Sequence, residues 1–215
     1  VGGGGLRPAH RPIRGEGHLR SEPGLGQGSG TCQEHAGLHR QPHRPALLRR
    51  DAGAAAVFAA PLDNASDALL FDYYKAVADA VKIPVVIHDF PDSFGTEIRP
   101  EVVARLGKEG GVNMIKMEEP PVGQKISRIR DLAGDDAMKI FGGLGGMFFL
   151  EELQRGAVGT MTGFAYPEVL VEIYNRFAAG DQKGAAAVFD RYCPLIRYEF
   201  QPKIGLALRK YIYQQ

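Results

Sequence analysis

Residues 84–119 read PVVIHDFPDSFGTEIRPEVVARLGKEGGVNMIKMEE, and this stretch contains two short apolar runs separated by a segment with helical periodicity. The runs at 84–90 and 112–118 are short enough to be strands of a parallel sheet that is buried on both faces. Pro100 opens the segment between them, because its fixed φ suits the first turn of a helix. A strand–helix–strand order of this kind is typical of α/β proteins with a parallel sheet.

The same alternation extends over residues 52–180. The other predicted strands span 54–61, 138–143 and 158–164, and the predicted helices span 68–81, 100–106, 122–132, 147–155 and 167–179. The close spacing of the units and the absence of a GxGxxG opening favour a (β/α)8 TIM barrel over a dinucleotide-binding fold. A complete barrel needs eight units, so the five visible units predict an incomplete barrel, followed by helices at about 183–199 and 203–213.

The composition changes near residue 51. Residues 1–50 hold five of the six histidines, many Arg and Pro residues and a GGGG run, but no Lys, Asp, Phe, Tyr or Met. They show no strand or helix periodicity and have too few apolar residues to offset the entropy of ordering. The histidine spacings match no metal-ligand pattern, so a metal site or a basic arm is the weaker interpretation. We expect residues 1–51 to be non-native or disordered sequence, such as a frameshifted reading of a GC-rich gene would produce.

The chain as a whole carries a net charge of +1 over 215 residues, of which 44% are hydrophobic and 24% charged. This near-neutral charge argues against nucleic acid or anionic lipid as the main partner. No run of about 18 apolar residues is present, so the sequence predicts no membrane span. Cys32 and Cys193 do not make a disulfide framework and no secretory signal is recognisable, so we expect a cytoplasmic protein.

Ionisable side chains stand at the carboxyl ends of two neighbouring predicted strands. His88 follows the apolar residues PVVI, and Lys116 follows VNMI. Catalytic groups of TIM barrels sit at these strand ends, so both side chains are expected to point into one mouth. Each residue also has an ordinary structural interpretation. A strand-end lysine is commonly a surface charge whose stem covers apolar surface, and a lone histidine is commonly structural.

The pair of residues nevertheless suits one kind of chemistry. An amine surrounded by apolar side chains has its ammonium form disfavoured, and a neutral amine forms a Schiff base with a ketone. An imidazole beside it can pass protons to and from the substrate. Glu118 and Glu119 have the alternative role of capping the next helix, whose N-terminus favours carboxylates. The GGLGG segment at 142–146 allows phosphate binding, close approach of another ligand, or a tight turn.

Five segments together resemble one known family, the dihydrodipicolinate synthase / N-acetylneuraminate lyase group of class I aldolases and dehydratases. The family's fourth strand is similar to GAAAVFAAP at 53–61, and its fifth strand, loop and helix to PVVIHDFPDSFGTEIRPEVVARL at 84–106. Its sixth strand, which carries the Schiff-base lysine, is similar to VNMIKMEE. Its seventh and eighth strands are similar to KIFGG and GAVGTMTGFAYPE. The resemblance implies that residues 52–180 are barrel strands four to eight and residues 181–215 are C-terminal helices.

The resemblance implies catalytic roles for two residues and binding roles for three. Lys116 would form the imine, and His88, which stands where the family usually has a tyrosine, would shuttle protons. Gly143, Met161 and Thr162 would line the keto-acid site. No metal or organic cofactor is implied, because the lysine imine supplies the electron sink. The family relation also implies a homo-oligomer, namely a tetramer.

The leading interpretation is therefore a Schiff-base lyase that breaks a carbon–carbon or carbon–oxygen bond of a small-molecule substrate. It would act through Lys116 on a pyruvate-type 2-keto acid or a 2-keto-3-deoxy sugar acid. The GTMTG segment and the acidic IKMEEPP turn favour the sugar-acid branch. Leu62 and Asp63 replace the tyrosine pair that commonly follows the fourth-strand proline, which argues against the lysine-biosynthetic synthase.

The family's Gly-Thr-Thr or Gly-Ser-Thr segment on strand two, which holds the substrate carboxylate, has no counterpart in the sequence. Two alternatives therefore stay open. One is a phosphate-binding TIM-barrel enzyme that uses GGLGG and GTMTG, where such folds often hold phosphate. The other is an inactive, truncated product that keeps the second half of the fold.

Overall fold

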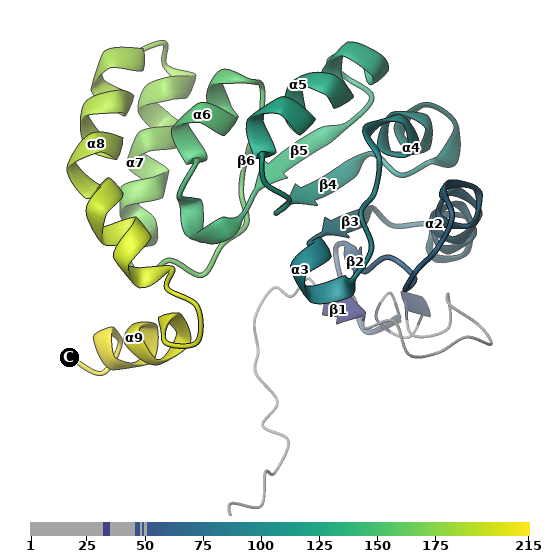
Figure 1. The fold of residues 1–215 in the computed structure, drawn as a ribbon, viewed down its shortest axis with the longest axis horizontal. Helices are drawn as coiled ribbons and strands as arrows, with labels where there is room; N and C mark the ends of the chain where they lie inside the picture. The colour runs from purple at the N-terminus through teal and green to yellow at the C-terminus, as the bar shows by residue number, and fades with distance from the viewer. Residues whose placement is uncertain (1–31, 35–45, 48, 50) are drawn as a thin grey trace, which may run out of the picture.

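The structure, a computed structural model, describes residues 32–34, 46, 47, 49 and 51–215. Its centre is a sheet of six strands that lie side by side in chain order, each parallel to its neighbours (Figure 1). The strands are β1 (Cys32–Glu34), β2 (Val57–Ala59), β3 (Val85–Asp89), β4 (Met114–Met117), β5 (Lys139–Gly142) and β6 (Gly159–Thr160). This parallel sheet, with its intervening helices, confirms the predicted incomplete (β/α)8 barrel.

A helix follows each of the strands β2 to β6. The helices are α2 (Asp67–Val81), α3 (Pro91–Phe94), α4 (Pro100–Arg105), α5 (Val122–Ala133), α6 (Phe149–Gln154), α7 (Pro167–Ala178), α8 (Gln182–Glu199) and α9 (Gly205–Ile212). Figure 1 shows α2, α4, α5, α6 and α7 as an outer arc, in which each helix packs against the next. The predicted helices match these bounds to within two residues, but α3 lies in a segment predicted as a loop.

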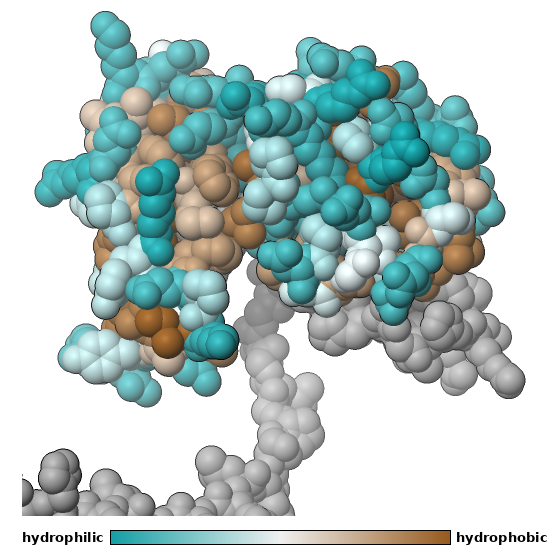
Figure 2. All heavy atoms as spheres, viewed as in Figure 1, coloured by the Kyte–Doolittle hydropathy of each residue, from teal (hydrophilic) through white to brown (hydrophobic). Residues whose placement is uncertain are grey.

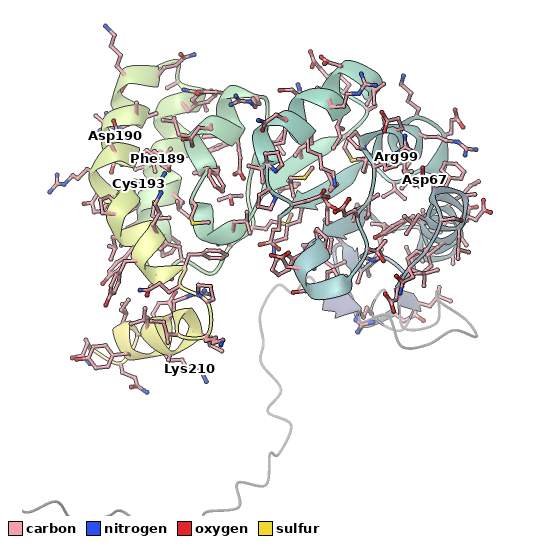
Figure 3. The ribbon with its side chains drawn as sticks, in the orientation of Figure 1. Asp67, Arg99, Phe189, Asp190, Cys193 and Lys210 are labelled. Atoms are coloured by element: carbon pink, nitrogen blue, oxygen red, sulfur yellow. The ribbon has the colours of Figure 1, made fainter. Side chains whose placement is uncertain are left out.

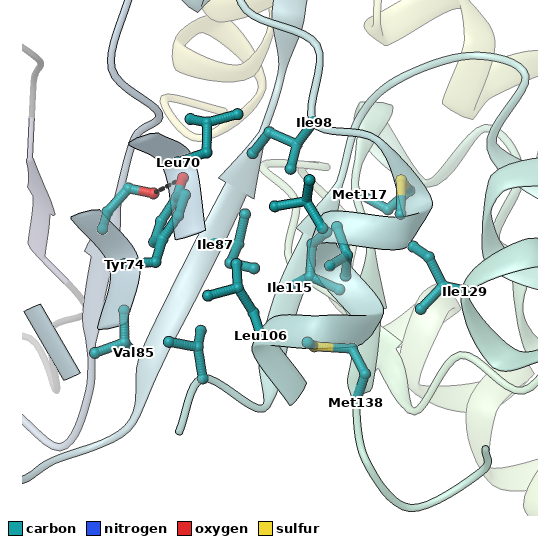
Figure 4. Close-up of a cluster of buried hydrophobic side chains, with 14 of the residues drawn as sticks. Leu70, Tyr74, Val85, Ile87, Ile98, Leu106, Ile115, Met117, Ile129 and Met138 are labelled. Carbon is teal, nitrogen blue, oxygen red and sulfur yellow. Dashed lines mark hydrogen bonds between the residues drawn. The ribbon is translucent and has the colours of Figure 1, made fainter. Parts of the chain in front are cut away.

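The core between sheet and helices follows from the alternation of side chains along a strand. Ile87 on β3 and Ile115 and Met117 on β4 are fully buried and pack with Leu70 and Ile129 from the helices (Figure 4). Burying each such side chain stabilises the fold by about 1.5–3 kcal/mol. Because these odd-numbered residues face the helices, the even-numbered residues between them face the opposite side of the sheet, where the predicted site lies.

A second apolar cluster holds α6, α7 and α8 together through Phe149, Leu170, Ile173, Phe189 and Ile196, which are all buried. Hydrophobic residues also remain at the surface, on the side of the molecule that carries α7 and α9 (Figure 2). None of the helices in the described part of the chain is long and apolar enough to span a bilayer.

Polar contacts fix the start of α2. The Ser66 hydroxyl accepts a hydrogen bond from the Leu69 N–H, which caps the helix. Asp67, in the first turn, accepts a hydrogen bond of 3.1 Å from Arg99, just before α4 (Figure 3). The two side chains are about half exposed, so this ion pair contributes little to the stability of the fold, although it links the starts of the two helices.

Most of the segment predicted as non-native or disordered, residues 1–51, lies outside the described residues. Residues 32–34 form the edge strand β1, whose register pairs Gln33 with Phe58 of β2. The prediction for the segment as a whole stays a prediction. Of the two cysteines, Cys193 on α8 is a free thiol.

Candidate active site

His88 and Lys116 stand opposite each other on β3 and β4, where the parallel register makes them Cα partners. Both alternate with core residues, so both side chains face away from the helices. Glu118 follows β4, and its backbone N–H donates to the Asp89 carbonyl at 2.8 Å. Glu118 is two residues beyond Lys116 and therefore faces the same side. The structure thus brings together the two predicted catalytic residues and one carboxylate.

The three side chains meet at a single carboxylate oxygen. Glu118 Oε2 lies 2.7 Å from Lys116 Nζ and 2.8 Å from His88 Nε2, while Lys116 Nζ and His88 Nε2 are 3.4 Å apart. A carboxylate only accepts hydrogen bonds, so its geometry assigns the proton of a neutral His88 ring to Nε2. His88 Nδ1, which is buried and lacks a hydrogen-bond partner among the described residues, agrees with this tautomer.

Glu118 is held as an anion by its surroundings. Burial raises the pKa of this carboxyl, but the hydrogen bond from His88 and the charge of Lys116 outweigh burial and lower the pKa to about 2. Its second oxygen, Oε1, accepts a hydrogen bond of 2.9 Å from the Leu144 N–H. Gly143 makes this approach possible, because a Cβ at that position would lie 2.3 Å from Glu118 Cγ.

Three phenylalanines surround the His88 ring. The ring centroids of Phe94, Phe58 and Phe90 lie 5.1, 5.7 and 6.1 Å from that of His88. Only 5% of His88 is exposed, whereas 17% of the Lys116 side chain is exposed. The site is therefore a small polar cluster beside an aromatic wall, and Lys116 is its most accessible side chain. The expectation of purely apolar surroundings for Lys116 is wrong, because Glu118 contacts it directly.

The alternative role of Glu118 and Glu119 as helix caps is wrong. Helix α5 begins after Pro121 without a side-chain hydrogen bond to its first turn. The sequence contained a signal for the real position of Glu118. In an extended strand, residues i and i+2 share a face, so Glu118 belongs with Lys116, and Met117 belongs with the core.

Asp89 and Glu119 belong to a different cluster, on the helix side of the sheet. The buried Lys125 on α5 lies 2.8 Å from Asp89 Oδ2 and also pairs with Glu119. Burial raises the pKa of Asp89 to about 7, although the Lys125 charge acts in the opposite direction. This cluster joins the end of β3 to α5, and it separates the second buried lysine from the site of Lys116.

The three predicted substrate-binding residues lie in different places. Gly143 flanks Glu118, as described above. The Met161 N–H donates to the Gly142 carbonyl at 2.9 Å, which extends the pairing of β6 with β5. Thr162 lines a cavity of about 300 Å³ between β6 and α7, together with Thr160 and Tyr174. In the described part of the chain neither Met161 nor Thr162 hydrogen-bonds to the Lys116 cluster, so their binding roles stay predictions.

A larger cavity of about 410 Å³ borders the site. Phe90 and Leu144, which contact the cluster, line one side of it, and residues 200–209 line the other. Arg209 in this lining pairs with the buried Glu199 at 2.9 Å, and Glu199 accepts hydrogen bonds from the Ala165 N–H. Among the described residues no group of three His, Cys, Asp or Glu side chains is placed to hold a metal ion.

The GGLGG segment forms a short 3-10 turn, η2 (Leu144–Gly146), after β5. Its first N–H, from Leu144, is already engaged by the Glu118 carboxylate. An anion at this turn would meet a negative charge at the place where the phosphate-binding alternative needs a free amide. No finding favours that alternative.

Comparison with known proteins identifies relatives of this chain. The sequence profile of the dihydrodipicolinate synthetase family matches residues 46–214. L-2-Keto-3-deoxyarabonate dehydratase from Azospirillum brasilense is 31% identical over 159 residues, which cover 71% of this chain and 51% of the relative. The 4-hydroxy-tetrahydrodipicolinate synthase of Methanothrix thermoacetophila is 34% identical over 154 residues, which cover 70% and 52%.

Solved structures agree with these sequence matches. The crystal structure of dihydrodipicolinate synthase from Rhodopseudomonas palustris superposes with a TM-score of 0.72 at 34% identity, over 80% of this chain and 60% of that one. The chain spans about half the length of the curated relatives it matches. With a family profile that matches most of its residues, the chain belongs to the dihydrodipicolinate synthetase family.

Proposed function

We propose that this protein is a Schiff-base lyase, acting on a pyruvate-type 2-keto acid or a 2-keto-3-deoxy sugar acid through Lys116. One observation carries the proposal: the Lys116 amine lies beside Glu118 and His88 at the carboxyl ends of β3 and β4. Strand ends of this kind are where TIM-barrel enzymes place their chemistry. The names of the relatives support the substrate class, because one is a keto-deoxy sugar-acid dehydratase and another a synthase of the same family.

The reaction begins when the Lys116 ammonium loses a proton, for which the Glu118 carboxylate, 2.7 Å away, is the acceptor within reach. The neutral amine adds to the C2 carbonyl of the substrate, and loss of water leaves an iminium. The iminium withdraws electrons from C3, so that a C3 proton can be removed to give an enamine. In a dehydration the enamine then expels the C4 hydroxyl, which takes up a proton equivalent to the one removed from C3 and leaves as water. In an aldol cleavage the iminium reacts directly: the C4 hydroxyl loses its proton, the C3–C4 bond breaks, the C4 fragment leaves as an aldehyde, and C3 keeps the electron pair as the enamine.

Glu118 is suited to hold the C3 proton because its pKa depends on the charge of Lys116. While the lysine nitrogen is cationic, that charge and the His88 hydrogen bond keep the pKa of Glu118 at about 2 despite burial. An enamine carries no such charge, so the pKa of the buried Glu118 carboxyl rises when the enamine forms. Glu118 thus takes up a proton in the step that releases one, with His88 as its hydrogen-bonded partner.

Borohydride trapping tests this proposal. Reduction in the presence of pyruvate should leave a pyruvyl adduct on Lys116, detected by intact mass and located by peptide mapping. Lys125, the other buried lysine near the sheet, is the internal control and should stay unmodified, because Asp89 and Glu119 enclose it on the helix side. If the chain folds but gives no adduct at any keto-acid concentration, the proposal is contradicted. The alternative that this chain is an inactive, truncated product would then be favoured.

We further propose that the protein is a cytoplasmic homo-oligomer, a tetramer by relation to its family. Exposed apolar side chains on α7 and α9 support an assembly through these helices, because Val171, Leu206 and Tyr211 are 55%, 63% and 63% exposed. We expect sedimentation to give a mass several times the 23.3 kDa of one chain. Leu206→Ser with Tyr211→Ser should shift the protein towards smaller species. A monomer at micromolar concentration would contradict this prediction.

A further inference from the structure

Glu152 on α6 is a fully buried carboxyl that the proposed chemistry does not use. It lies against the end of β5, where a Cβ at Gly142 would stand 1.7 Å from Glu152 Oε2. Gly142 and Gly143 are therefore packed between two acidic side chains, Glu152 on one side and Glu118 on the other. The next residue, Leu144, supplies the N–H that holds Glu118.

Within the described residues no cation pairs with this carboxyl, and neither of its oxygens has a donor in hydrogen-bond geometry. Burial, followed by the charges of Glu151 and Glu118, raises the pKa of Glu152 to about 8, and the nearby Gly143 amide offsets only part of the effect. Glu151 lies on the same helix and Glu118 in the loop after β4, while no charged group of α5, α7, α8 or β6, which all pack against α6, contributes to the pKa of Glu152.

We propose that Glu152 is a positioning residue that supports the Gly142–Leu144 turn in its uncharged, protonated form, and so keeps Glu118 between Lys116 and His88. The buried position of the Glu152 carboxyl is by itself a reason for the group to be protonated. A carboxylate at this place would be buried without a partner and would face the Glu118 anion across two glycines. Loss of the proton at alkaline pH should therefore push the turn and the Leu144 N–H away from Glu118. The catalytic importance of this effect rests on the proposed function, but its two tests do not.

The first test is the pH dependence of stability. The unfolded chain ionises Glu152 above about pH 4.5, whereas the folded chain keeps the proton up to about pH 8, so stability falls over this window. Glu152→Gln is isosteric and cannot ionise. We expect it to melt like wild type at pH 5 and roughly 5–10 °C higher at pH 8.5. Glu168→Gln, at an exposed carboxyl on α7, is the control and should follow wild type at both pH values.

The second test follows the turn itself, through the amide NMR signal of Leu144. In wild type this signal should shift with a midpoint near pH 8, and in Glu152→Gln the step should be absent. A Leu144 signal that is constant between pH 6 and 9, or that moves equally in both proteins, would overturn the positioning role. If the melting temperatures of wild type and Glu152→Gln change with pH in the same way, the inference that folded Glu152 keeps its proton would be wrong. Failure of borohydride trapping, by contrast, bears only on the function proposed for Lys116.

Discussion

Lys116→Arg abolishes the pyruvate adduct and lowers any lyase turnover by roughly 10⁴-fold or more, if Lys116 carries the imine. Arginine keeps a positive charge beside Glu118, but its guanidinium does not deprotonate in proteins and cannot add to a ketone. The change thus removes the nucleophile while the ion pair with the carboxylate is retained. Trapping with borohydride and the turnover of 2-keto acids measure the effect directly.

Lys116→Met separates the chemical role of the lysine from its structural one. Methionine fills a similar volume but leaves the buried Glu118 anion with His88 as its remaining side-chain partner. We expect this variant to be destabilised by about 3 kcal/mol in urea unfolding at pH 7, because removing one partner of a buried ion pair leaves the other charge buried and uncompensated. Lys116→Arg should be close to wild type in the same measurement. An adduct that persists in either variant would show that another amine reacts.

The fold was largely predictable because its signals are local. Each strand is a short apolar run, and each helix carries an apolar face of regular period, so PVVIHDF and VNMIK were recognisable as β3 and β4 without any tertiary information. The short helix α3 was missed because Pro91, Asp92 and Ser93 have the composition of a loop, and only the packing of Phe94 on His88 selects a helical turn there.

The site was less predictable because its contacts are not local. The alternation of the two strands was enough to pair His88 with Lys116, but Glu118, the partner of both, was given only the alternative role of a helix cap, because carboxylates favour a helix N-terminus. Its real role depends on Leu144, which is 26 residues further along the chain. Likewise nothing near Glu152 in the sequence indicates that its carboxyl lies against Gly142, because that contact arises only when α6 packs on β5.

Glu118→Gln is expected to lower kcat by about 10²–10⁴-fold while leaving the borohydride adduct on Lys116 detectable. Glutamine keeps the shape of the side chain and can accept the Leu144 hydrogen bond, but it cannot hold a proton taken from C3. Imine formation uses Glu118 only as an acceptor of the lysine proton, whereas turnover also needs Glu118 for the C3 proton, so imine formation should slow less than turnover. Rapid-quench trapping and steady-state rates distinguish the two steps. Equal losses in both would assign Glu118 to activation of the lysine alone.

The pH dependence of stability provides an independent control for the same variant. The pKa of Glu118 is about 2 in the folded chain and about 4.5 in the unfolded chain, so its contribution is complete above pH 4.5 and disappears as the pH falls through 2. Glu118→Gln should therefore be less stable than wild type by about 3 kcal/mol at pH 7 and equally stable near pH 2. A deficit that does not change with pH would mean that lost packing, and not lost charge, explains the variant. In that case its effect on turnover could not be attributed to proton transfer.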